Sequence, residues 1–451
     1  MRDFNTLLPA MAMVIALGMP GASKAATGPC DLLATGGAPC VAAHSTTRAL
    51  LGAYSGPLYQ LRRSDGQFKD VTPVSAGGVA DASIQTTFCA GKTCTISEIY
   101  DQSGKANHLK RSLGGGEVCK HQDREAVADA LPLKLGGNNV FGIKVEADNN
   151  GACTPPAGGE GTGYRLDKTS SIATGDQAET MYMITSGDMA AHGNSGCCFD
   201  YGNVETDDKD DGAATMEAIY FGGGAGWGRG GGSGPWVLAD MENGVFSGST
   251  NAYTGNTSVP YTYVTAVLIG RSGGTYALLA GNSQSGTLKT MYDGARPNGY
   301  TVMKKQGAIV LGTGGDNSDH GKGYFFEGVM TSGAASIATM NQVQANIVGA
   351  GYGSSVTSVR ESRVAHPSYS LSYDPTRKIA VIDWTQNESG IVEIDVVDLR
   401  GSRVATLVNE VMQAGPHQVS WSAASTATGV HLVRFRGQGS DATSASRIIL
   451  E

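Results

Sequence analysis

Short apolar runs separated by turn residues dominate the chain from Cys30 to about Gly353. Examples are Met181-Tyr182-Met183-Ile184 and the run at residues 263–269, with Gly, Ser, Asn and Asp clusters between such runs. Apolar runs of this length, bounded by turn residues, are typical of β-strands. We therefore expect an all-β chain, with a β-sandwich or jelly roll as its architecture.

One segment of this region has helical rather than strand periodicity. Within residues 335–348, the apolar residues Ile337, Met340, Val343 and Ile347 recur at helical spacing, and Gly349 follows. The pattern predicts a helix that packs on the sandwich as a lid or edge cover.

The composition changes after Gly353. Residues 354–370 have neither strong periodicity nor glycine clusters, and we interpret them as a linker. Strand candidates follow at residues 379–382, 391–399, 418–421, 430–435 and 447–450. They predict a second, small Ig-like β-sandwich over residues 371–451, after a first domain over residues 27–353.

The first 26 residues have the features of a signal peptide. Arg2 precedes an apolar stretch at residues 7–19, and small residues follow as far as Ala26. A buried N-terminal helix is the alternative. No later segment approaches the ~20 consecutive apolar residues needed to span a bilayer, so we expect no membrane span in the mature chain.

Charge and cysteine content narrow the function classes. Charged residues make up 16% of the 451 residues and the net charge is -8, so no basic surface is available for nucleic acid. All eight cysteines lie before residue 200, which fits an oxidising compartment. Cys30–Cys40 and Cys89–Cys94 each bracket a short loop and are expected to pair locally. Cys119, Cys153, Cys197 and Cys198 allow three pairings, and zinc is disfavoured because no CxxC pair occurs.

Two carboxylates end the apolar run at residues 236–239. Asp240 and Glu242 are spaced i, i+2, which in a strand places both side chains on one face. Two like charges side by side raise at least one pKa, as acid and base chemistry requires. The alternative is a solvated strand end beside a turn.

A third carboxylate, Asp316, follows the strand-like residues 308–311 in a glycine-rich loop. Glycines let a carboxylate approach a ligand closely, although a turn-forming Asp-Asn pair or a calcium loop are alternatives. The spacing of a calcium loop is absent. Residues 207–211 (DDKDD) are interpreted as a solvated loop. Trp227, set among glycines, is a candidate platform for a sugar ring, with core packing as its alternative.

Taken together, these segments resemble the catalytic domain of the family 54 glycoside hydrolases, which are α-L-arabinofuranosidases. The resemblance covers roughly residues 28–353. It is carried by residues 28–30 (GPC), 39–50 (PCVAAHSTTRAL), 99–104 (IYDQSG), 197–203 (CCFDYGN), 216–220 (MEAIY), 240–243 (DMEN), 294–297 (GARP), 315–318 (GDNS) and 327–333 (EGVMTSG).

This resemblance implies a concanavalin-like β-sandwich (jelly roll) and an exo-acting, retaining arabinofuranosidase with no cofactor and no metal. It places Glu242 at the nucleophile and Asp316 at the general acid/base. Further positions that it implies contact the sugar: Trp227, Asp240, Asn243, Gly315, and Cys197 with Cys198, which matches a vicinal disulfide. Cys119 and Cys153 have no counterpart, and we expect them to pair across an insertion.

The C-terminal region departs from the family, whose members usually carry an arabinose-binding β-trefoil there. Residues 396–401 (VVDLRG), 415–421 (GPHQVSW) and 429–435 (GVHLVRF) instead resemble the C-terminal sorting domains of bacterial type IX secretion. That resemblance implies a bacterial protein that is secreted or attached to the cell surface. A carbohydrate-binding or spacer sandwich is the rival interpretation.

The expected substrates are arabinose-containing plant polysaccharides such as arabinan and arabinoxylan. A non-catalytic polysaccharide-binding lectin needs Trp227 but neither Glu242 nor Asp316, so the two acids argue against it. Another glycosidase specificity, such as that of a β-xylosidase, stays open because the two pentoses offer similar hydroxyl groups.

Overall fold

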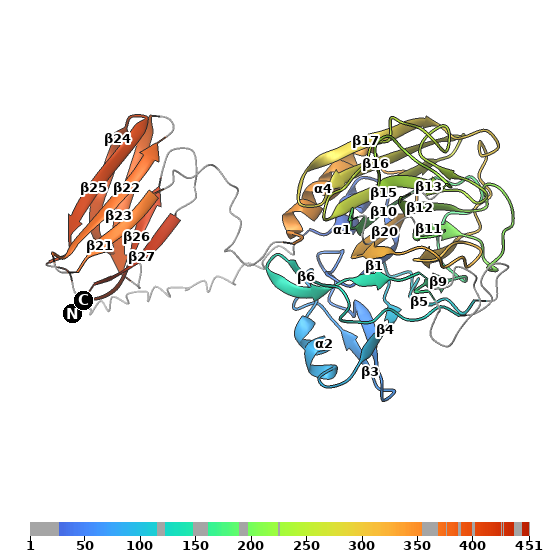
Figure 1. The fold of residues 1–451 in the computed structure, drawn as a ribbon, viewed down its shortest axis with the longest axis horizontal. Helices are drawn as coiled ribbons and strands as arrows, with labels where there is room; N and C mark the ends of the chain where they lie inside the picture. The colour runs from blue at the N-terminus through green and yellow to red at the C-terminus, as the bar shows by residue number, and fades with distance from the viewer. Residues whose placement is uncertain are drawn as a thin grey trace, which may run out of the picture. The chain divides into compact units, whose positions relative to one another are not determined.

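The computed structural model describes residues 27–114, 122–147, 161–188, 197–223, 226–353, 369–375, 377–386, 389–398, 402–424, 426, 428–436 and 444–450. The chain divides into two compact units, Met1–Val356 and Thr357–Glu451, and each is described by itself (Figure 1). The predicted signal peptide, most of the predicted linker, Cys119 and Cys153 lie outside the described residues.

One sheet of the first unit has six antiparallel strands in the order β1-β20-β10-β15-β16-β17. β10 and β20 are buried along their whole length, including the glutamate with which each begins. The bounds are β1 Cys40–Ser45, β10 Glu179–Thr185, β15 Val264–Arg271, β16 Thr275–Asn282, β17 Ser285–Ala295 and β20 Glu327–Thr331.

The other large sheet has ten strands in the order β14-β13-β12-β11-β18-β9-β5-β4-β2-β3. Their bounds are β2 Tyr59–Arg63, β3 Phe68–Val71, β4 Cys94–Ile99, β5 Leu109–Arg111, β9 Tyr164–Leu166, β11 Asp200–Val204, β12 Glu217–Gly222, β13 Trp236–Asp240, β14 Val245–Phe246 and β18 Ala308–Leu311. Two small pairs complete the unit: β6 Pro132–Leu135 with β7 Asn138–Phe141, and β8 Ile143–Val145 with β19 Gly323–Phe325.

The two large sheets pack face to face around one core. Alternate residues of the ten-stranded sheet, such as Tyr201, Ile219 and Val237, join that core together with Met181 of the six-stranded sheet. The residues between them, such as Ala218 and Leu238, belong to small separate clusters on the outer face. Alternation along a strand therefore gives β11, β12 and β13 one core face and one outer face, and the predicted all-β sandwich is confirmed.

The predicted helix is confirmed, but its bounds were two residues too early. Helix α4 spans Ile337–Ala350, with Ser336 as N-cap accepting the Thr339 N–H at 3.0 Å. It ends at Gly351, whose left-handed φ of 75° suits a residue without a Cβ, and it packs against α1 (Pro29–Thr35) and β17. Sequence reasoning did not find α1 or α2 (Ala82–Phe88), because a helix of seven residues is too short to show a clear periodicity.

The second unit contains two sheets, with orders β21-β22-β25 and β24-β23-β26-β27. Their strands are β21 Tyr369–Asp374, β22 Ile379–Gln386, β23 Gly390–Asp398, β24 Arg403–Met412, β25 Gly415–Ser422, β26 Gly429–Arg436 and β27 Ser444–Leu450. Ile382, Trp384, Ile394 and Val433 form its separate core. The prediction missed β21 and β24, and the first two residues of β21 fall in the predicted linker. Within the described residues of both units, no helix combines the length and hydropathy needed to cross a membrane.

Candidate active site

Glu242 lies on the turn that connects β13 to β14. The Met241 N–H donates to the Gly244 carbonyl at 3.1 Å, and the two residues between them, Glu242 and Asn243, have φ angles of 59° and 55°. Two successive positive φ angles are the signature of a type I′ hairpin turn, which normally favours Asn and Gly. The prediction that Glu242 extends the strand was wrong: β13 ends at Asp240, and Glu242 is held in a strained turn, as functional residues often are.

Asp240 and Glu242 nevertheless lie next to each other. The Glu242 backbone N–H donates to Asp240 Oδ1 at 3.2 Å, and the Tyr300 hydroxyl donates to the Glu242 carbonyl at 3.0 Å. Both acidic side chains are largely buried, with exposed fractions of 5% for Asp240 and 8% for Glu242. The turn therefore presents two poorly hydrated carboxyl groups at the end of β13.

A further carboxyl group, that of Glu205, reaches the same point from the end of β11. A Cβ at Gly315 would clash with Glu205 Oε2 and would lie 3.2 Å from Glu242 Oε2. The carboxyl groups of Glu205 and Glu242 thus both lie against Gly315, and any side chain at this position would displace them. This explains in physical terms why the position requires glycine.

The clustered carboxyl groups have raised pKa values. Burial, followed by the nearby Glu205, Asp240 and Asp316, raises the pKa of Glu242 to about 10. Burial, with Asp316 and Glu205, raises the pKa of Asp240 to about 7. Buried Asp200, opposite Tyr220 in the β11–β12 pair, has its pKa raised well above the usual range by burial and then by Asp240. Such a group of carboxyls can supply both an acid and a base near neutral pH.

Asp316 lies on a tightly folded loop after β18. Asp316 Oδ1 accepts the Ser318 N–H at 3.0 Å, and the Gly314 N–H donates to the Ser318 carbonyl at 2.9 Å. The loop is also tied to the neighbouring strand and segment, since Gly312 N–H donates to the Asp200 carbonyl at 2.8 Å and His320 N–H to the Cys197 carbonyl at 3.0 Å. The loop carries a partly exposed carboxyl group beside the buried cluster.

Cys197 and Cys198 form a vicinal disulfide at the edge of the cluster, and Cys30–Cys40 and Cys89–Cys94 are also bonded. The sulfurs of Cys197 and Cys198 lie 3.8 and 3.6 Å from Asp240 Oδ2. Cys198 packs with Tyr220, Trp236, Leu238 and Val245 on the outer face of the sheet. The four residues Cys197, Cys198, Asp200 and Asp240 are close enough to hold a metal ion, but bonded cysteines offer no thiolate ligand.

Trp227 and Asn243 lie at the margin of the cluster. The Trp227 side chain is 53% exposed, so it is not a core tryptophan. Its neighbour Gly228 lies against β14, because a Cβ there would come within 2.7 Å of the Val245 carbonyl. The Asn243 amide donates to Asp210 Oδ1 at 2.8 Å, which gives the predicted solvated loop at residues 207–211 a role in holding the turn.

Arg165 of β9 supports the site from behind. Its guanidinium donates to the Gly315 carbonyl at 2.8 Å and to the Glu205 carbonyl, and it forms ion pairs with Asp167 and Asp208. One buried cation thereby fixes the backbone on both sides of the carboxyl cluster. Because these groups come from distant segments, sequence reasoning missed Arg165, Asp200 and Glu205; the only signal was their place in or beside short buried strands.

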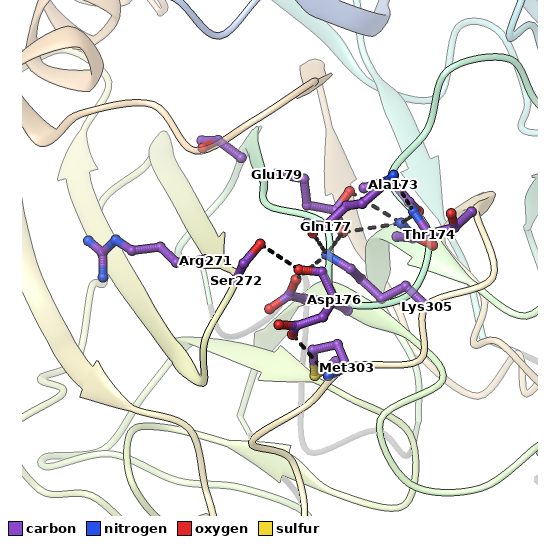
Figure 2. A network of polar contacts seen from close by, with 12 residues as sticks. Ala173, Thr174, Asp176, Gln177, Glu179, Arg271, Ser272, Met303 and Lys305 are labelled. Carbon is purple, nitrogen blue, oxygen red and sulfur yellow. Dashed lines mark hydrogen bonds and ion pairs between the residues drawn. The ribbon is translucent and has the colours of Figure 1, made fainter.

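A different polar network lies between the two large sheets, on the core-facing side of β12 (Figure 2). Lys305 Nζ donates to the Gln177 carbonyl at 2.7 Å and lies 2.8 Å from Glu179 Oε1 and 2.9 Å from Glu217 Oε2. Arg296 also pairs with Glu217. The charges of Lys305 and Arg296 outweigh the burial that would raise the pKa of Glu217, and they lower it. This network joins β10 of one sheet to β12 of the other.

Fold and site together define a class of protein. Cleavage of a glycosidic bond commonly uses one ionised and one protonated carboxyl group on either side of the bond. Here several carboxyl groups with raised pKa values meet at the end of β13, beside an exposed tryptophan and a vicinal disulfide. That arrangement is the one expected of a glycoside hydrolase on a β-sandwich.

Comparison with known proteins agrees with this class. The family "Alpha-L-arabinofuranosidase B, catalytic" matches residues 29–353. A probable α-L-arabinofuranosidase B from Aspergillus terreus is 50% identical over 359 residues, covering 78% of this chain and 67% of the relative. An arabinofuranosidase/B-xylosidase from Trichoderma koningii is 50% identical over 349 residues, covering 76% of this chain and 66% of the relative.

A solved structure agrees as well. The crystal structure of arabinofuranosidase complexed with arabinofuranosyl-alpha-1,2-xylobiose is 43% identical, with a TM-score of 0.67, and covers 83% of this chain and 76% of that chain. The chain therefore belongs to the α-L-arabinofuranosidase B catalytic-domain family. It is a glycoside hydrolase with arabinofuranosidase activity.

Proposed function

We propose that the chain is a retaining, exo-acting arabinofuranosidase that removes terminal α-L-arabinofuranosyl groups from arabinan or arabinoxylan, with Glu242 as nucleophile and Asp316 as acid/base. The observation that carries this proposal is the placement of Glu242 on a strained turn, buried and surrounded by Asp240, Glu205 and Asp316.

The proposed reaction has two steps. Glu242 attacks the anomeric carbon while Asp316 protonates the departing oxygen, and Asp316 then deprotonates the water that hydrolyses the glycosyl-enzyme ester. Asp316 suits the second role because its side chain is partly exposed whereas that of Glu242 is buried, and water must reach it. The retained configuration follows from two successive inversions.

Further residues would bind the sugar. Asp240, Asn243 and Gly315 surround Glu242, and the Cys197–Cys198 disulfide offers a rigid apolar surface beside Asp240. Trp227 offers an exposed indole face for stacking. The substrate class is supported by the similar arabinofuranosidase structure that holds an arabinofuranosyl-xylobiose.

A second specificity, β-xylosidase activity, is favoured by the Trichoderma koningii relative, whose description carries both activities. The proposal requires that arabinofuranoside cleavage exceed xylopyranoside cleavage.

The second unit has a separate proposal. We infer from the segments at residues 396–401, 415–421 and 429–435 that it is a sorting domain recognised by the type IX secretion machinery, which would place the protein outside a bacterial cell or on its surface. Secretion as such is supported by the relatives, whereas the bacterial route rests on this resemblance alone. Mass spectrometry of the exported protein tests it: loss of residues beyond about 357 is expected, and an intact C-terminus without attachment to the cell surface would contradict it.

The direct test of the activity is release of 4-nitrophenol from its α-L-arabinofuranoside and its β-D-xylopyranoside. The parent should prefer the arabinofuranoside, and Glu242→Gln and Asp316→Asn should each lower kcat by at least about a thousandfold with unchanged thermal unfolding at acidic pH. A parent that binds arabinan but releases nothing would favour the lectin, and either variant retaining full activity would overturn its assigned role.

A further inference from the structure

Asp123 is a buried carboxyl group that the proposed reaction does not use. Its side chain is 1% exposed, and within the described residues neither of its oxygens accepts a hydrogen bond from an N–H group or an alcohol hydroxyl. A buried negative charge without such donors is costly, so Asp123 is expected to keep a proton. In agreement, burial, followed by the nearby Asp319, raises its pKa well above the usual range; Asp208 adds to this effect, and Arg165 offsets only part of it.

The hydrogen-bond partner of the Asp123 side chain is the side chain of Asp319. A hydrogen bond between two carboxyl groups requires a proton on one of them. Asp319 is equally buried, but its Oδ2 accepts the Gly161 N–H at 2.9 Å, and such donation favours the ionised form of a carboxyl group. The proton therefore belongs to Asp123, which donates the hydrogen bond, and the carboxylate of Asp319 accepts it.

Two glycines leave the space that this pair of carboxyl groups occupies. A Cβ at Gly161 would lie 2.7 Å from Asp319 Oδ2, and a Cβ at Gly163 would overlap Asp123 Oδ2. Neither position can therefore carry a side chain while the two carboxyl groups are paired. The short segment from Gly161 to Gly163 is thus shaped to fit the Asp123–Asp319 pair.

Asp319 belongs to the loop that carries Asp316, the proposed acid/base. Asp316 Oδ1 accepts the N–H of Ser318 at 3.0 Å, and Ser318 directly precedes Asp319 in the chain. A shift of Asp319 therefore moves the group to which the Asp316 carboxyl is hydrogen-bonded. The position of the acid/base depends in this way on what holds Asp319.

A second connection to the same loop runs through Ser112. The Ser112 carbonyl accepts the Asp123 N–H at 2.9 Å, and the Ser112 hydroxyl donates to the side chain of Asn317. Asn317 directly follows Asp316 in the chain. The backbone of Asp123 is thus tied, through Ser112, to the loop that its side chain also contacts.

We propose that Asp123 is a positioning residue, which as a neutral acid donates a hydrogen bond to Asp319 and so holds the loop where Asp316 can protonate the leaving oxygen. This proposal rests on Asp316 being the acid/base. Asp123 itself exchanges no proton during the reaction. Its loss therefore affects the steps that depend on the position of Asp316.

The size of that effect depends on the leaving group. The anion of 4-nitrophenol is stable and needs little protonation as it departs, whereas the methoxide of a methyl glycoside must receive a proton. Since kcat/KM includes the step in which the leaving group departs, a displaced Asp316 lowers kcat/KM far more for methyl α-L-arabinofuranoside than for 4-nitrophenyl α-L-arabinofuranoside. A loss of folded protein, by contrast, lowers both values by the same factor.

The test compares the full chain with Asp123→Leu and Asp123→Asn on these two substrates, with thermal unfolding as the control for folding. Asp123→Leu cannot donate, and kcat/KM should fall about 100-fold for the methyl glycoside but no more than about fivefold for the 4-nitrophenyl glycoside. Asp123→Asn keeps a donor for Asp319 and should restore the methyl glycoside value to within about fivefold of the parent. Equal losses on both substrates in Asp123→Leu, or no restoration in Asp123→Asn, overturn the proposal.

Two further variants keep the test decisive. Gly163→Ala covers the case in which Asp123→Leu does not fold, because its methyl group overlaps Asp123 Oδ2. It should cause the same selective loss on the methyl glycoside by a smaller factor, and an unselective loss counts against the proposal. Lys305→Met weakens a network whose partners lie outside this loop and should affect both substrates equally; a selective loss there would show that general destabilisation explains the result.

Asp316→Asn separates this proposal from the proposed function. If its loss of kcat/KM is no greater on the methyl glycoside than on the 4-nitrophenyl glycoside, the acid/base assignment fails. If Asp316→Asn shows the selective loss and Asp123→Leu does not, only the role of Asp123 fails.

Discussion

The acidic residues between the two large sheets and those at the active-site end of β13 are in opposite situations. On the core side, Glu179 and Glu217 are fully buried but lie against Lys305 and Arg296. At the active-site end, Glu242 and Asp240 are nearly as buried, yet their neighbours are other carboxyl groups. Buried acids that are compensated by cations join the two sheets, whereas uncompensated ones hold protons and are available for chemistry.

The largest expected effect comes from removing a cation from the ion-pair network between the two sheets. Lys305→Met removes one of the two cations that neutralise Glu179 and Glu217. Removing one partner from a buried ion pair lowers the free energy of unfolding by about 3–5 kcal/mol. The thermal midpoint of the first unit should fall by about 10 °C. Circular dichroism melting measures this, with Lys304→Met as the control because Lys304 is exposed. Equal midpoints for both variants would show that the network is not needed for stability.

The next largest effect tests how the carboxyl groups of the active site pack against Gly315. Gly315→Ala places a methyl group against Glu205 Oε2 and Glu242 Oε2 and should lower kcat about a hundredfold, since small displacements of reacting groups have effects of that size. Gly349→Ala is the matched control, because a Cβ at Gly349 in α4 meets no atom within 4 Å. Steady-state kinetics of both variants provides the comparison, and a loss below threefold for Gly315→Ala would contradict the proposed packing.

A smaller effect is expected at the margin of the site. Trp227→Ala removes the exposed indole and should raise KM about tenfold, which corresponds to about 1.4 kcal/mol of lost stacking. Phe68→Ala, another exposed aromatic residue at the far edge strand β3, should leave KM unchanged. If the two substitutions act alike, Trp227 does not contact the substrate.

The smallest effect concerns stability rather than rate. Because the pKa of Glu242 is raised from 4.5 to about 10 in the folded protein, its contribution to stability is complete below about pH 4.5 and declines as the pH rises toward 10. Glu242→Gln removes that decline. Its thermal midpoint should match the parent at pH 4 and exceed it by a few degrees at pH 8. A difference that does not grow with pH would contradict the raised pKa.

Sequence reasoning could predict the features that are local. The alternating short strands gave the sandwich, and the spacing of Asp240 and Glu242 marked the end of β13. It placed Glu242 in a strand, because a positive φ at a glutamate has no sequence signal apart from the following Asn243-Gly244. Glu205 and Arg165 could not be found, since their importance depends on Gly315, more than a hundred residues away along the chain. Compensation of Glu217 by Lys305 is likewise a property of the folded chain.

The account depends most on Glu242, rather than its neighbour Glu205, forming the bond to the sugar. A mechanism-based inhibitor, such as an arabinofuranose-configured cyclic sulfate, should label the nucleophile, and peptide mapping by mass spectrometry locates the ester. We predict one label per chain, on Glu242. A label on Glu205 or Asp240, with Glu242 unmodified, would contradict the central claim.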